Sequence, residues 1–419
     1  MCTMRIAIYH NLPSGGAKRA LQELVKGLGP RHHVDVFTLS SADHGFADLR
    51  PYVNGHQVMD FQPLPLFRSP WGRLNQLMRM ADLLRLQQLT RRLAQTLEQG
   101  DYDVAFVQPC QFEVSPSLLS RLQTVPTVYF CQEPLRRVYE PMPARPYNQP
   151  RNSWRRRLDR LDPLPGLYHL LLKQADRHNV RQADRVLVNS HFVRRAVDRI
   201  YGVEAHVSYL GVDVRQFRPL GLAREKMVLS VGSLTPLKGF DFLIRSLARL
   251  PAADRPRLAI ASNFQNPPER DYLHQLAAEL DVELALLGNV SDQRLVELYN
   301  QAQVTVYAPV REPFGLVALE SMACGTPVIA VREGGTQETV LHDQTGLLVR
   351  RDEREFAEAL ARLLSNPAQA REYGQAGREH VVRHWSWSRA VSTLEGHLEM
   401  AIQSRLQPLG APQPLHESR

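Results

Sequence analysis

Short apolar runs alternate with longer amphipathic segments in the first part of the chain. Arg5–Tyr9 is a run typical of a buried strand, and apolar residues at 17–28 recur at the spacing of one helix face. The run His33–Thr38 predicts the next strand, and the turn-rich segment Asn11–Gly16 separates the first strand from the helix. This order of strand, glycine-containing loop, helix and strand is typical of a parallel sheet covered by helices.

The alternation continues through the next hundred residues. A long helix is predicted over Gly72–Gln99, with an apolar face made of Leu74, Leu77, Met78, Ala81 and Leu84. Further strands are predicted at Asp103–Val107, Pro126–Phe130 and Arg185–Asn189, and a helix is predicted from His191. A stretch rich in proline and arginine, 134–165, interrupts this series.

A second series begins near Met227. Its strand Met227–Val231 leads into the turn Gly232–Gly239 and a predicted helix, Phe240–Leu250. Further strands are predicted at Arg257–Ala261, Glu283–Leu287, Val304–Tyr307 and Pro327–Val331, and final helices at Ala368–His384 and Ser386–Ser404. We therefore expect two doubly wound α/β domains, 1–209 and 210–385, that bind ligands at the carboxyl ends of their strands. Residues 405–419 are expected to form a flexible tail.

The composition excludes several classes of protein. Of the 419 residues, 43% are hydrophobic and 22% are charged, so global disorder is excluded. No apolar run approaches the ~18 residues of a membrane-spanning helix, and Ile6–Tyr9 is too short for a secretory signal. We expect a cytoplasmic protein, with peripheral membrane contact as an open alternative. The four cysteines contain no C-x-x-C pair, so neither a zinc ribbon nor a redox dithiol is indicated.

The segment REPFGLVALESMACG (Arg311–Gly325) is the first candidate site. Leu316–Cys324 is predicted as a helix, so the backbone amides of Gly315–Val317 would be unpaired donors at its N-terminus, suited to phosphate. Glu312 precedes this helix, and Glu320 lies within it, where a carboxylate can accept two hydrogen bonds from a ribose diol. The alternative is that both are solvated charges at the ends of a helix.

Two other segments follow strands of the second series. Lys238 lies in the glycine-bounded turn of VGSLTPLKGFD (Val231–Asp241), where a cation can neutralise a diphosphate. The glycine pair of REGGTQE (Arg332–Glu338) would let backbone approach a ligand closely. A surface lysine and a plain turn are the alternatives. All three segments are expected to converge on one edge of the second sheet.

Together these segments resemble the retaining GT-B glycosyltransferases of family GT4. Seven residues separate Glu312 from Glu320, as in the E-x7-E motif of that family. The segments 228–250 (VLSVGSLTPLKGFDFLIRSLARL), 333–349 (EGGTQETV–HDQTGLLV) and 209–219 (YLGVDVRQFRP) also resemble it. The resemblance implies the GT-B fold, two Rossmann-like domains facing a central cleft, with the helix 386–404 crossing back onto the N-terminal domain.

The resemblance also implies a role for each matching residue. Glu320 would hold the ribose of a nucleotide-diphosphate sugar, Glu312 the donor sugar, and Lys238 the diphosphate. Gly15 and Gly16 would approach the phosphates from across the cleft. The implied donor-binding residues of the C-terminal domain are Ser233, Lys238, Asn289, Val290, Phe314, Gly315, Leu316, Val317 and Glu320. Lys18 is interpreted as a charge on a helix surface.

The chain departs from the family pattern at two positions. Ser233 replaces an arginine, for which Arg245 or Arg311 could substitute. Gln132, in the sequence Cys-Gln-Glu-Pro, replaces a histidine; glutamine donates a hydrogen bond to a sugar hydroxyl but exchanges no proton.

The implied catalytic residues are Glu312, Lys238 and Gln132. They would transfer a sugar, with retained configuration, to a glycan, lipid-linked or small-molecule acceptor. No metal and no cofactor besides the donor sugar are implied, because Lys238 and helix amides would stabilise the leaving diphosphate. The alternatives are a nucleotide-sugar-binding protein without transfer activity, an epimerase of the nucleotide sugar, and a basic RNA-binding protein.

Eight arginines lie between Pro134 and Arg160, within a chain of net charge +8. We interpret this basic insert as an acceptor loop for an anionic lipid or diphosphate-linked glycan, or as a contact with an anionic membrane. A solvated loop in an arginine-rich chain is the alternative. Nucleic-acid binding is not expected, because no recognised nucleic-acid module accompanies the charge.

Overall fold

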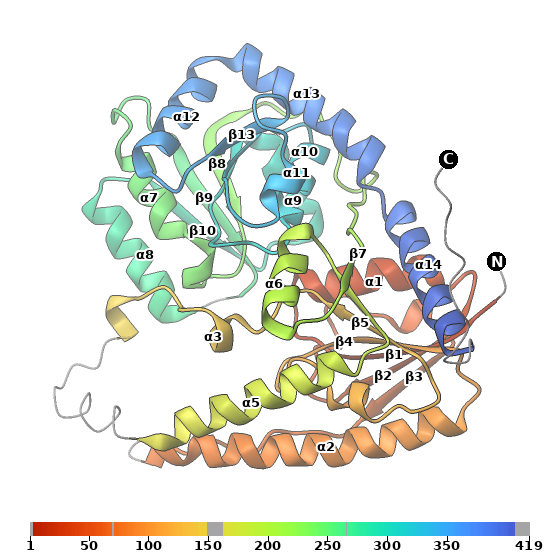
Figure 1. Ribbon diagram of the computed structural model, residues 1–419. Helices are drawn as coiled ribbons and strands as arrows, with labels where there is room; N and C mark the ends of the chain where they lie inside the picture. Colours follow the sequence, from red (N-terminus) through yellow and green to blue (C-terminus); the bar gives the residue numbers. More distant parts are fainter. Residues whose placement is uncertain (1–2, 69–70, 149–161, 265, 407–419) are drawn as a thin grey trace, which may run out of the picture.

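The computed structural model describes residues 3–68, 71–148, 162–264 and 266–406, and it contains two parallel sheets with helices on both faces (Figure 1). In the described residues the first sheet has the strand order β3-β2-β1-β4-β5-β6-β7 and the second β10-β9-β8-β11-β12-β13. Both orders are those of doubly wound sheets, so the predicted fold class is confirmed. The predicted flexible tail, 405–419, is wrong at its first two residues, which belong to the last helix, Trp387–Leu406. Residues 407–419 lie outside the described residues.

The strands of the first sheet are β1 (Arg5–Asn11), β2 (His33–Leu39), β3 (Gly55–Met59), β4 (Val104–Cys110), β5 (Thr127–Cys131), β6 (Arg185–Val188) and β7 (Ala205–Val207). Those of the second are β8 (Glu225–Val231), β9 (Arg257–Ser262), β10 (Leu284–Gly288), β11 (Ala302–Tyr307), β12 (Val328–Val331) and β13 (Gly346–Val349). The central strands match the apolar runs, but the edge strands β3, β7 and β13 were not predicted. Strands β3 and β7 are short and partly exposed, so they carry little apolar signal, whereas β13 is buried but only four residues long.

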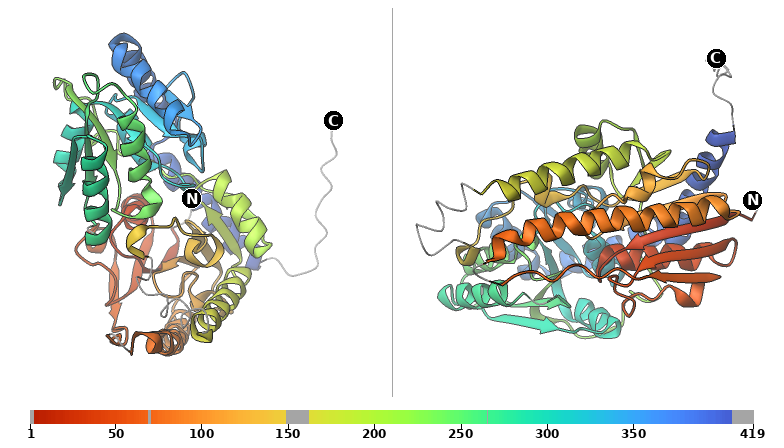
Figure 2. Two further views of the ribbon diagram at one scale, coloured as in Figure 1. Left: turned by 90° about the vertical axis from the view of Figure 1, so that its left-hand side faces the viewer. Right: turned by 90° about the horizontal axis from the view of Figure 1, so that it is seen from below.

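The helices cover both faces of each sheet (Figure 2). In the first half they are α1 (Gly16–Leu28), α2 (Asn75–Gln99), α3 (Arg136–Tyr139), α5 (Pro163–Arg181) and α6 (His191–Tyr201). In the second half they are α7 (Phe240–Ala248), α8 (Pro267–Glu279), α9 (Asp292–Gln301), α10 (Leu316–Ala323), α11 (Thr336–Thr339), α12 (Glu353–Ser365), α13 (Pro367–His384) and α14 (Trp387–Leu406). The part of the chain that the structure describes also contains five short 3-10 segments, Arg50–Tyr52, Trp71–Leu74, Ser117–Ser120, Pro146–Asn148 and Pro236–Lys238.

The predicted apolar face of α2 is wrong. Leu84 is 62% exposed and Leu77 is 41% exposed, whereas Leu86, Leu93 and Leu97 in the second half of the helix are buried. The rotation of α2 is set instead by polar contacts, because the carboxylate of Asp82 accepts the backbone N–H of Leu64 and the hydroxyl of Thr90 bonds that of Ser117.

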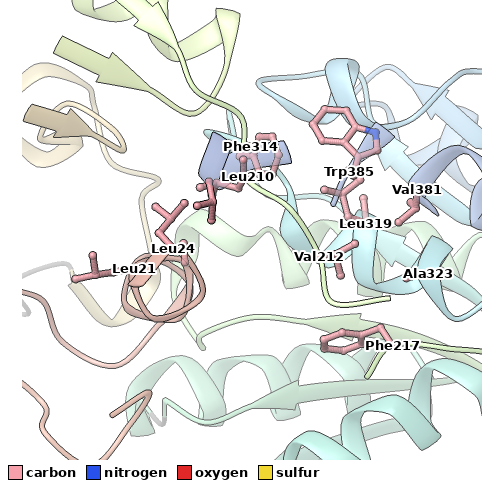
Figure 3. Packing of buried hydrophobic residues seen from close by; sticks show 14 of the residues in the cluster. Leu21, Leu24, Leu210, Val212, Phe217, Phe314, Leu319, Ala323, Val381 and Trp385 are labelled. Carbon is pink, nitrogen blue, oxygen red and sulfur yellow. The ribbon is translucent and has the colours of Figure 1, made fainter. Parts of the chain in front are cut away.

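Helix α14 returns from the second half of the chain and packs along α1 of the first (Figure 1). A Cβ atom on Gly27 of α1 would lie 2.4 Å from Val391, so glycine permits this close approach. At the same crossing, Leu24, Leu210, Phe314 and Trp385 belong to one buried cluster (Figure 3). One apolar core therefore continues through both halves and fixes the relative position of the two sheets.

Candidate functional site

The loop before α10 brings glycine backbone and unpaired amides to the carboxyl edge of the second sheet. Gly315 has a φ of 101° and is the N-terminal cap of α10, so the first amides of this helix face out of the loop. The Arg332–Glu338 glycines support this loop from behind. A Cβ atom on Gly334 would lie 2.1 Å from the carbonyl oxygen of Glu312, and one on Gly335 would lie 2.3 Å from that of Pro313. These two glycines therefore approach the backbone of the protein itself.

Lys238 and Glu312 come together at this edge. The Nζ atom of Lys238 lies 2.9 Å from Oε2 of Glu312, and the two side chains keep 24% and 16% of their surface exposed. The aliphatic stem of Lys238 passes over Gly232, where an added Cβ would lie 3.3 Å from Cδ of the lysine. Three loops that contain glycine, 232–239, 312–315 and 332–338, therefore meet around the ion pair of Lys238 and Glu312. Both charged side chains remain partly exposed there.

Glu320 lies deeper in α10 and is 8% exposed. Its Oε2 accepts a hydrogen bond of 2.8 Å from the hydroxyl of Tyr299. Burial raises the pKa of Glu320, and the guanidinium of Arg19 opposes that rise. Arg19 comes from α1 and forms an ion pair of 2.6 Å with Asp292 of α9, so it bridges the two halves of the chain beside Glu320.

Gly15 and Gly16 lie opposite the start of α10. A Cβ atom on Gly16 would lie 3.7 Å from Cδ1 of Leu316, whereas one on Gly15 would meet no atom within 4 Å. The N-terminal ends of α1 and α10 therefore face each other, and both carry the partial positive charge of a helix start. The sequence predicted these glycines but not Arg19, one turn further along α1.

Asn289 and Val290, which the resemblance implied as donor-binding residues, follow β10. Asn289 has a φ of 51°. The backbone N–H of Val290 donates to Oδ1 of Asn263 at 2.9 Å, and the Nδ2 of Asn263 donates back to the carbonyl of Val290 at 3.3 Å. Asn263 was not predicted, because it lies on a different loop, after β9.

Phe314 contributes backbone only. Its side chain is 3% exposed and lies beside that of Trp385 (Figure 3). The ring of Phe314 lies 5.5 Å from that of Trp385 and 6.2 Å from that of Tyr209. Because this aromatic cluster is part of the core between the halves, the side chain of Phe314 is held away from the cleft.

The two candidates for replacing an arginine at Ser233 lie elsewhere. Arg245 contacts the hydroxyl of Tyr272 at 3.5 Å, and Arg311 pairs with Glu140 at 3.2 Å. Ser233 itself is half-buried, and its carbonyl accepts the N–H of Thr235 at 2.8 Å. Among the described contacts neither arginine reaches Lys238.

Gln132 and Glu133 follow β5 on the opposite wall of the cleft. Nε2 of Gln132 donates to Oε1 of Gln108 at 3.2 Å and to the carbonyl of Ala17 at 3.4 Å. The side chain of Glu133 is 46% exposed and lies 3.7 Å from the guanidinium of Arg136. Partial loss of hydration raises the pKa of Glu133 to about 6; the charge of Arg136 opposes the rise, and that of Glu312 adds to it.

A small pocket opens beside Glu133. Its wall includes Arg136, Tyr139, Phe192, Arg311 and Pro313. Arg136 also closes the gap between the halves, because its guanidinium donates to the backbone carbonyls of Val310 and Arg311. The sequence did not predict Glu133 and Arg136 as site residues. They lie far from Glu312 in the chain, and only the fold places them beside the loop that contains it.

Other bonds hold the two halves together. The carboxylate of Glu338 accepts the backbone N–H groups of His191 and Phe192 at 2.9 Å and the hydroxyl of Tyr209 at 2.9 Å. The hydroxyl of Ser190 donates to the carbonyl of Pro313 at 2.6 Å. Glu338 thus occupies the N-terminus of α6, and the glycine segment 332–338 joins the walls of the cleft.

One described arginine of the basic insert, Arg145, is not available to a ligand or a membrane. Arg145 is 5% exposed and forms ion pairs of 2.9 Å with Asp241 and 3.0 Å with Glu269, so it lies inside the protein. Residues 149–161, with the remaining arginines from Arg151 on, lie outside the described residues. Lys18 was also misjudged: it is 2% exposed, not a surface charge.

Two protein-family models match this chain. One, described as Glycosyl transferases group 1, matches residues 215–380, and one described as Glycosyltransferase Family 4 matches residues 14–216. Together they extend over both sheets.

Curated relatives match over about half of their own length. The D-inositol 3-phosphate glycosyltransferase of Acidothermus cellulolyticus is 37% identical over 246 residues, which are 52% of this chain and 53% of that relative. The D-inositol 3-phosphate glycosyltransferase 2 of Catenulispora acidiphila is 34% identical over 232 residues, 50% of this chain and 54% of that relative.

Solved structures share the fold over nearly the whole chain. The sucrose-phosphate synthase of Thermosynechococcus elongatus has a TM-score of 0.73 at 22% identity, covering 96% of this chain and 100% of that one. HepE of Anabaena, in complex with UDP-glucose, has a TM-score of 0.68 at 20% identity, covering 95% of this chain and 100% of that one. Both are similar to this chain in architecture.

Proposed function

This chain belongs to the group 1, family 4 glycosyltransferases, and on that premise we propose that it transfers a sugar from a nucleotide-diphosphate sugar to an acceptor hydroxyl, with retained configuration. The observation that carries the proposal is the convergence of the Lys238–Glu312 pair, Glu320 and the start of α10 on the space faced by Gly15 and Gly16. The acceptor class we propose is a glycan, a lipid-linked sugar or a small polyol.

The donor diphosphate would lie between the two facing helix starts. Amides at the beginning of α10 would donate to phosphate oxygens, and Lys238 would turn from Glu312 toward the bridging oxygen. Glu312 would then accept hydrogen bonds from the donor sugar, and Glu320 from the ribose. As the bond between the anomeric carbon and the phosphate oxygen breaks, negative charge develops where these donors already point. We propose that no metal ion is needed, so turnover should survive chelation by EDTA.

Glu133 would act on the acceptor. Its carboxylate lies on the wall opposite Glu312, beside the pocket lined by Arg136 and Phe192. A carboxyl group with a pKa of about 6 is ionised at neutral pH and close enough to it to exchange a proton. It would accept the hydrogen of the attacking hydroxyl, a task that Gln132 cannot perform.

Two other activities are alternatives to sugar transfer. The presence of Ser233 favours a nucleotide-sugar-binding protein without transfer activity, because neither Arg245 nor Arg311 takes the place of the missing arginine beside Lys238. It would bind donor and leave it intact with every acceptor. An epimerase would release an isomerised nucleotide sugar without acceptor, so product analysis in the absence of acceptor identifies that activity. Product analysis with acceptors present separates the transferase from the binding protein.

The nucleotide screen is the first test. UDP, GDP and ADP should be compared by thermal shift, because a ligand at about a hundred times its Kd stabilises the folded state by about 2.7 kcal/mol. We expect one of them to raise the melting temperature. Glu320→Gln should weaken that nucleotide about tenfold or more, since a charged acceptor for two ribose hydroxyls is lost. Gln can still accept from Tyr299, so the fold is kept.

The matched control is Glu297→Gln, which changes an exposed carboxylate of α9 that pairs with Arg294. Equal nucleotide affinity in Glu320→Gln and the control would remove Glu320 from the donor site. Absence of any nucleotide effect in the unmodified chain would refute the proposed function.

The dependence of kcat/KM on pH tests the proposed role of Glu133. Because the reaction needs the ionised form of Glu133, kcat/KM should rise as pH increases through about 6 and level off above it. Glu133→Gln should abolish this limb and lower the rate by about a hundredfold or more. Gln132→Ala should cost roughly tenfold or less, because Gln132 only donates hydrogen bonds. A larger loss for Gln132→Ala than for Glu133→Gln would reverse the assignment.

We also propose peripheral contact with an anionic membrane. Leu84 of α2 and Leu167 and Leu170 of α5 are exposed, an unusual number of large apolar side chains for two adjacent helices. No helix among the described residues is long and apolar enough to span a bilayer. Sedimentation with phosphatidylserine vesicles should retain the chain, and Leu167→Glu with Leu170→Glu should release it. Equal sedimentation of the variant would exclude this surface.

A further inference from the structure

A row of buried polar side chains crosses the carboxyl edge of the first sheet. His10 of β1 lies beside Thr38 of β2 in the parallel register, and Gln108 lies on β4, the other neighbour of β1. All three side chains are fully buried. Each keeps a polar atom with no hydrogen-bond partner among the described residues, namely Nε2 of His10, Oγ1 of Thr38 and Nε2 of Gln108. Buried polar atoms normally have partners, so three orphans in one row call for an explanation.

Lys18 adds a buried cation to this row. It lies in the first turn of α1 and is 2% exposed, close enough to His10 for its charge to lower the pKa of that histidine. Within the described ranges it forms no hydrogen bond and no ion pair. Asp43 and Asp48 are the nearest carboxylates to act on it, and both are engaged elsewhere: Asp43 accepts the N–H groups of Gly45 and Phe46, and Asp48 pairs with Arg50.

The orphaned groups are mostly donors. Nδ1 of His10 accepts the N–H of Leu12 at 3.4 Å, so the neutral ring carries its hydrogen on Nε2. Oε1 of Gln108 accepts from Gln132 at 3.2 Å, which leaves the amide hydrogens of Gln108 unused. The ammonium of Lys18 supplies three further donors and a full charge. Water could satisfy the neutral donors and can still reach the ammonium, but an anion would also compensate the positive charge of a side chain that is only 2% exposed.

We propose that Lys18, His10, Gln108 and Thr38 form a second anion site, distinct from the diphosphate site at Lys238, which binds a phosphate or carboxylate group. Gln132 joins this row to the cleft, because it bonds both Gln108 and the carbonyl of Ala17. The site therefore lies behind the acceptor wall, and the bound group belongs to the acceptor. That last step rests on the proposed function; the binding of an oxyanion does not.

The test measures binding without catalysis. The full chain is saturated with whichever nucleotide diphosphate stabilises it, so that the donor site is occupied. Inorganic phosphate and acetate are then titrated separately, at constant ionic strength, and followed by thermal shift and calorimetry. We expect at least one of the two anions to bind, and the pair to distinguish a phosphate site from a carboxylate site.

Substitutions test whether the anion binds at the row of buried polar side chains. Lys18→Met keeps the volume and removes the charge, so it should fold with equal or greater stability and bind the anion roughly tenfold or more weakly. Thr38→Val changes one buried hydroxyl and should also weaken binding; it decides the question if Lys18→Met does not fold. Lys26→Met, on the same helix but paired with Glu23 at the surface, should bind like the unmodified chain.

Each outcome of these titrations either supports or overturns the proposed anion site. Weaker binding in both row variants, with unchanged binding in Lys26→Met, supports the site. Binding of neither anion by the unmodified chain would show that water alone fills the row, and equal binding in all variants would place the anion elsewhere; either overturns the inference. Nucleotide binding is recorded in the same titrations, so a failed anion site with intact nucleotide binding leaves the proposed function standing.

Discussion

Replacing Lys238 with alanine is expected to raise the barrier for donor turnover by about 2–4 kcal/mol, the cost of losing one preorganised donor at a developing negative charge. The side chain is preorganised here by its surroundings. Its stem packs over Gly232, its loop is closed by Gly239 at a φ of 66°, and its ammonium is held 2.9 Å from Glu312. Its loss removes the positive charge and leaves Glu312 without its partner. Steady-state kinetics with saturating donor should show the fall in kcat.

The control for this substitution is Lys226→Ala. Lys226 is an exposed lysine whose ammonium donates to the carbonyl of Ala253, remote from the site. It should leave kcat unchanged. If Lys238→Ala behaves like the control, the leaving diphosphate is stabilised by other groups and Lys238 has no part in the mechanism.

Replacing Arg145 with methionine is expected to lower the free energy of unfolding by about 3–5 kcal/mol, as when one partner is removed from a buried ion pair. The guanidinium bonds both oxygens of Glu269, pairs with Asp241, and lies 5.2 Å from the ring centre of Tyr272. Glu269 has no exposed side-chain surface, so without Arg145 its charge stays buried and unpaired. Chemical denaturation should show a lower midpoint.

A second substitution separates charge from packing. Adding Glu269→Leu to Arg145→Met should recover much of the loss, because an apolar pair replaces a buried charge that has no partner. The surface pair of Arg249 and Glu353, 2.7 Å apart, is the matched control. Arg249→Met should cost about 1 kcal/mol or less. Equal losses for Arg145→Met and Arg249→Met would mean that solvent reaches Glu269.

The central strands of both sheets were predictable because fully buried parallel strands are continuous apolar runs. The rotation of α2 was not, because hydrogen bonds of Asp82 and Thr90 decide which side is covered. Lys18 was placed on the surface because a lysine in a helix is usually exposed. Here the sheet lies under the first turn of α1, and the lysine points into it.

In the candidate site too, some residues were predictable from the sequence and others were not. Glu312, Glu320 and Lys238 could be selected because each lies within a local pattern of glycines, a strand and a helix. Arg19, Glu133 and Asn263 carry no such pattern; their partners lie far away in the sequence, so only the folded chain identifies them. Phe314 was correctly placed in the loop, but the destination of its side chain depends on Trp385, far along the chain.

The attachment of Arg145 to α7 and α8 has a mechanical consequence. The segment around this arginine precedes β6 in the chain, yet its strongest bonds are to the other half of the molecule. A hinge placed only in the linker at 210–219 would stretch this contact as well as the others between the halves. The hydroxyl of Tyr139 donates to Asp176 of α5 at 2.7 Å and holds the start of the segment to the first half. Widening of the cleft therefore requires either that the chain bends between Tyr139 and Arg145 or that the buried ion pairs of Arg145 separate.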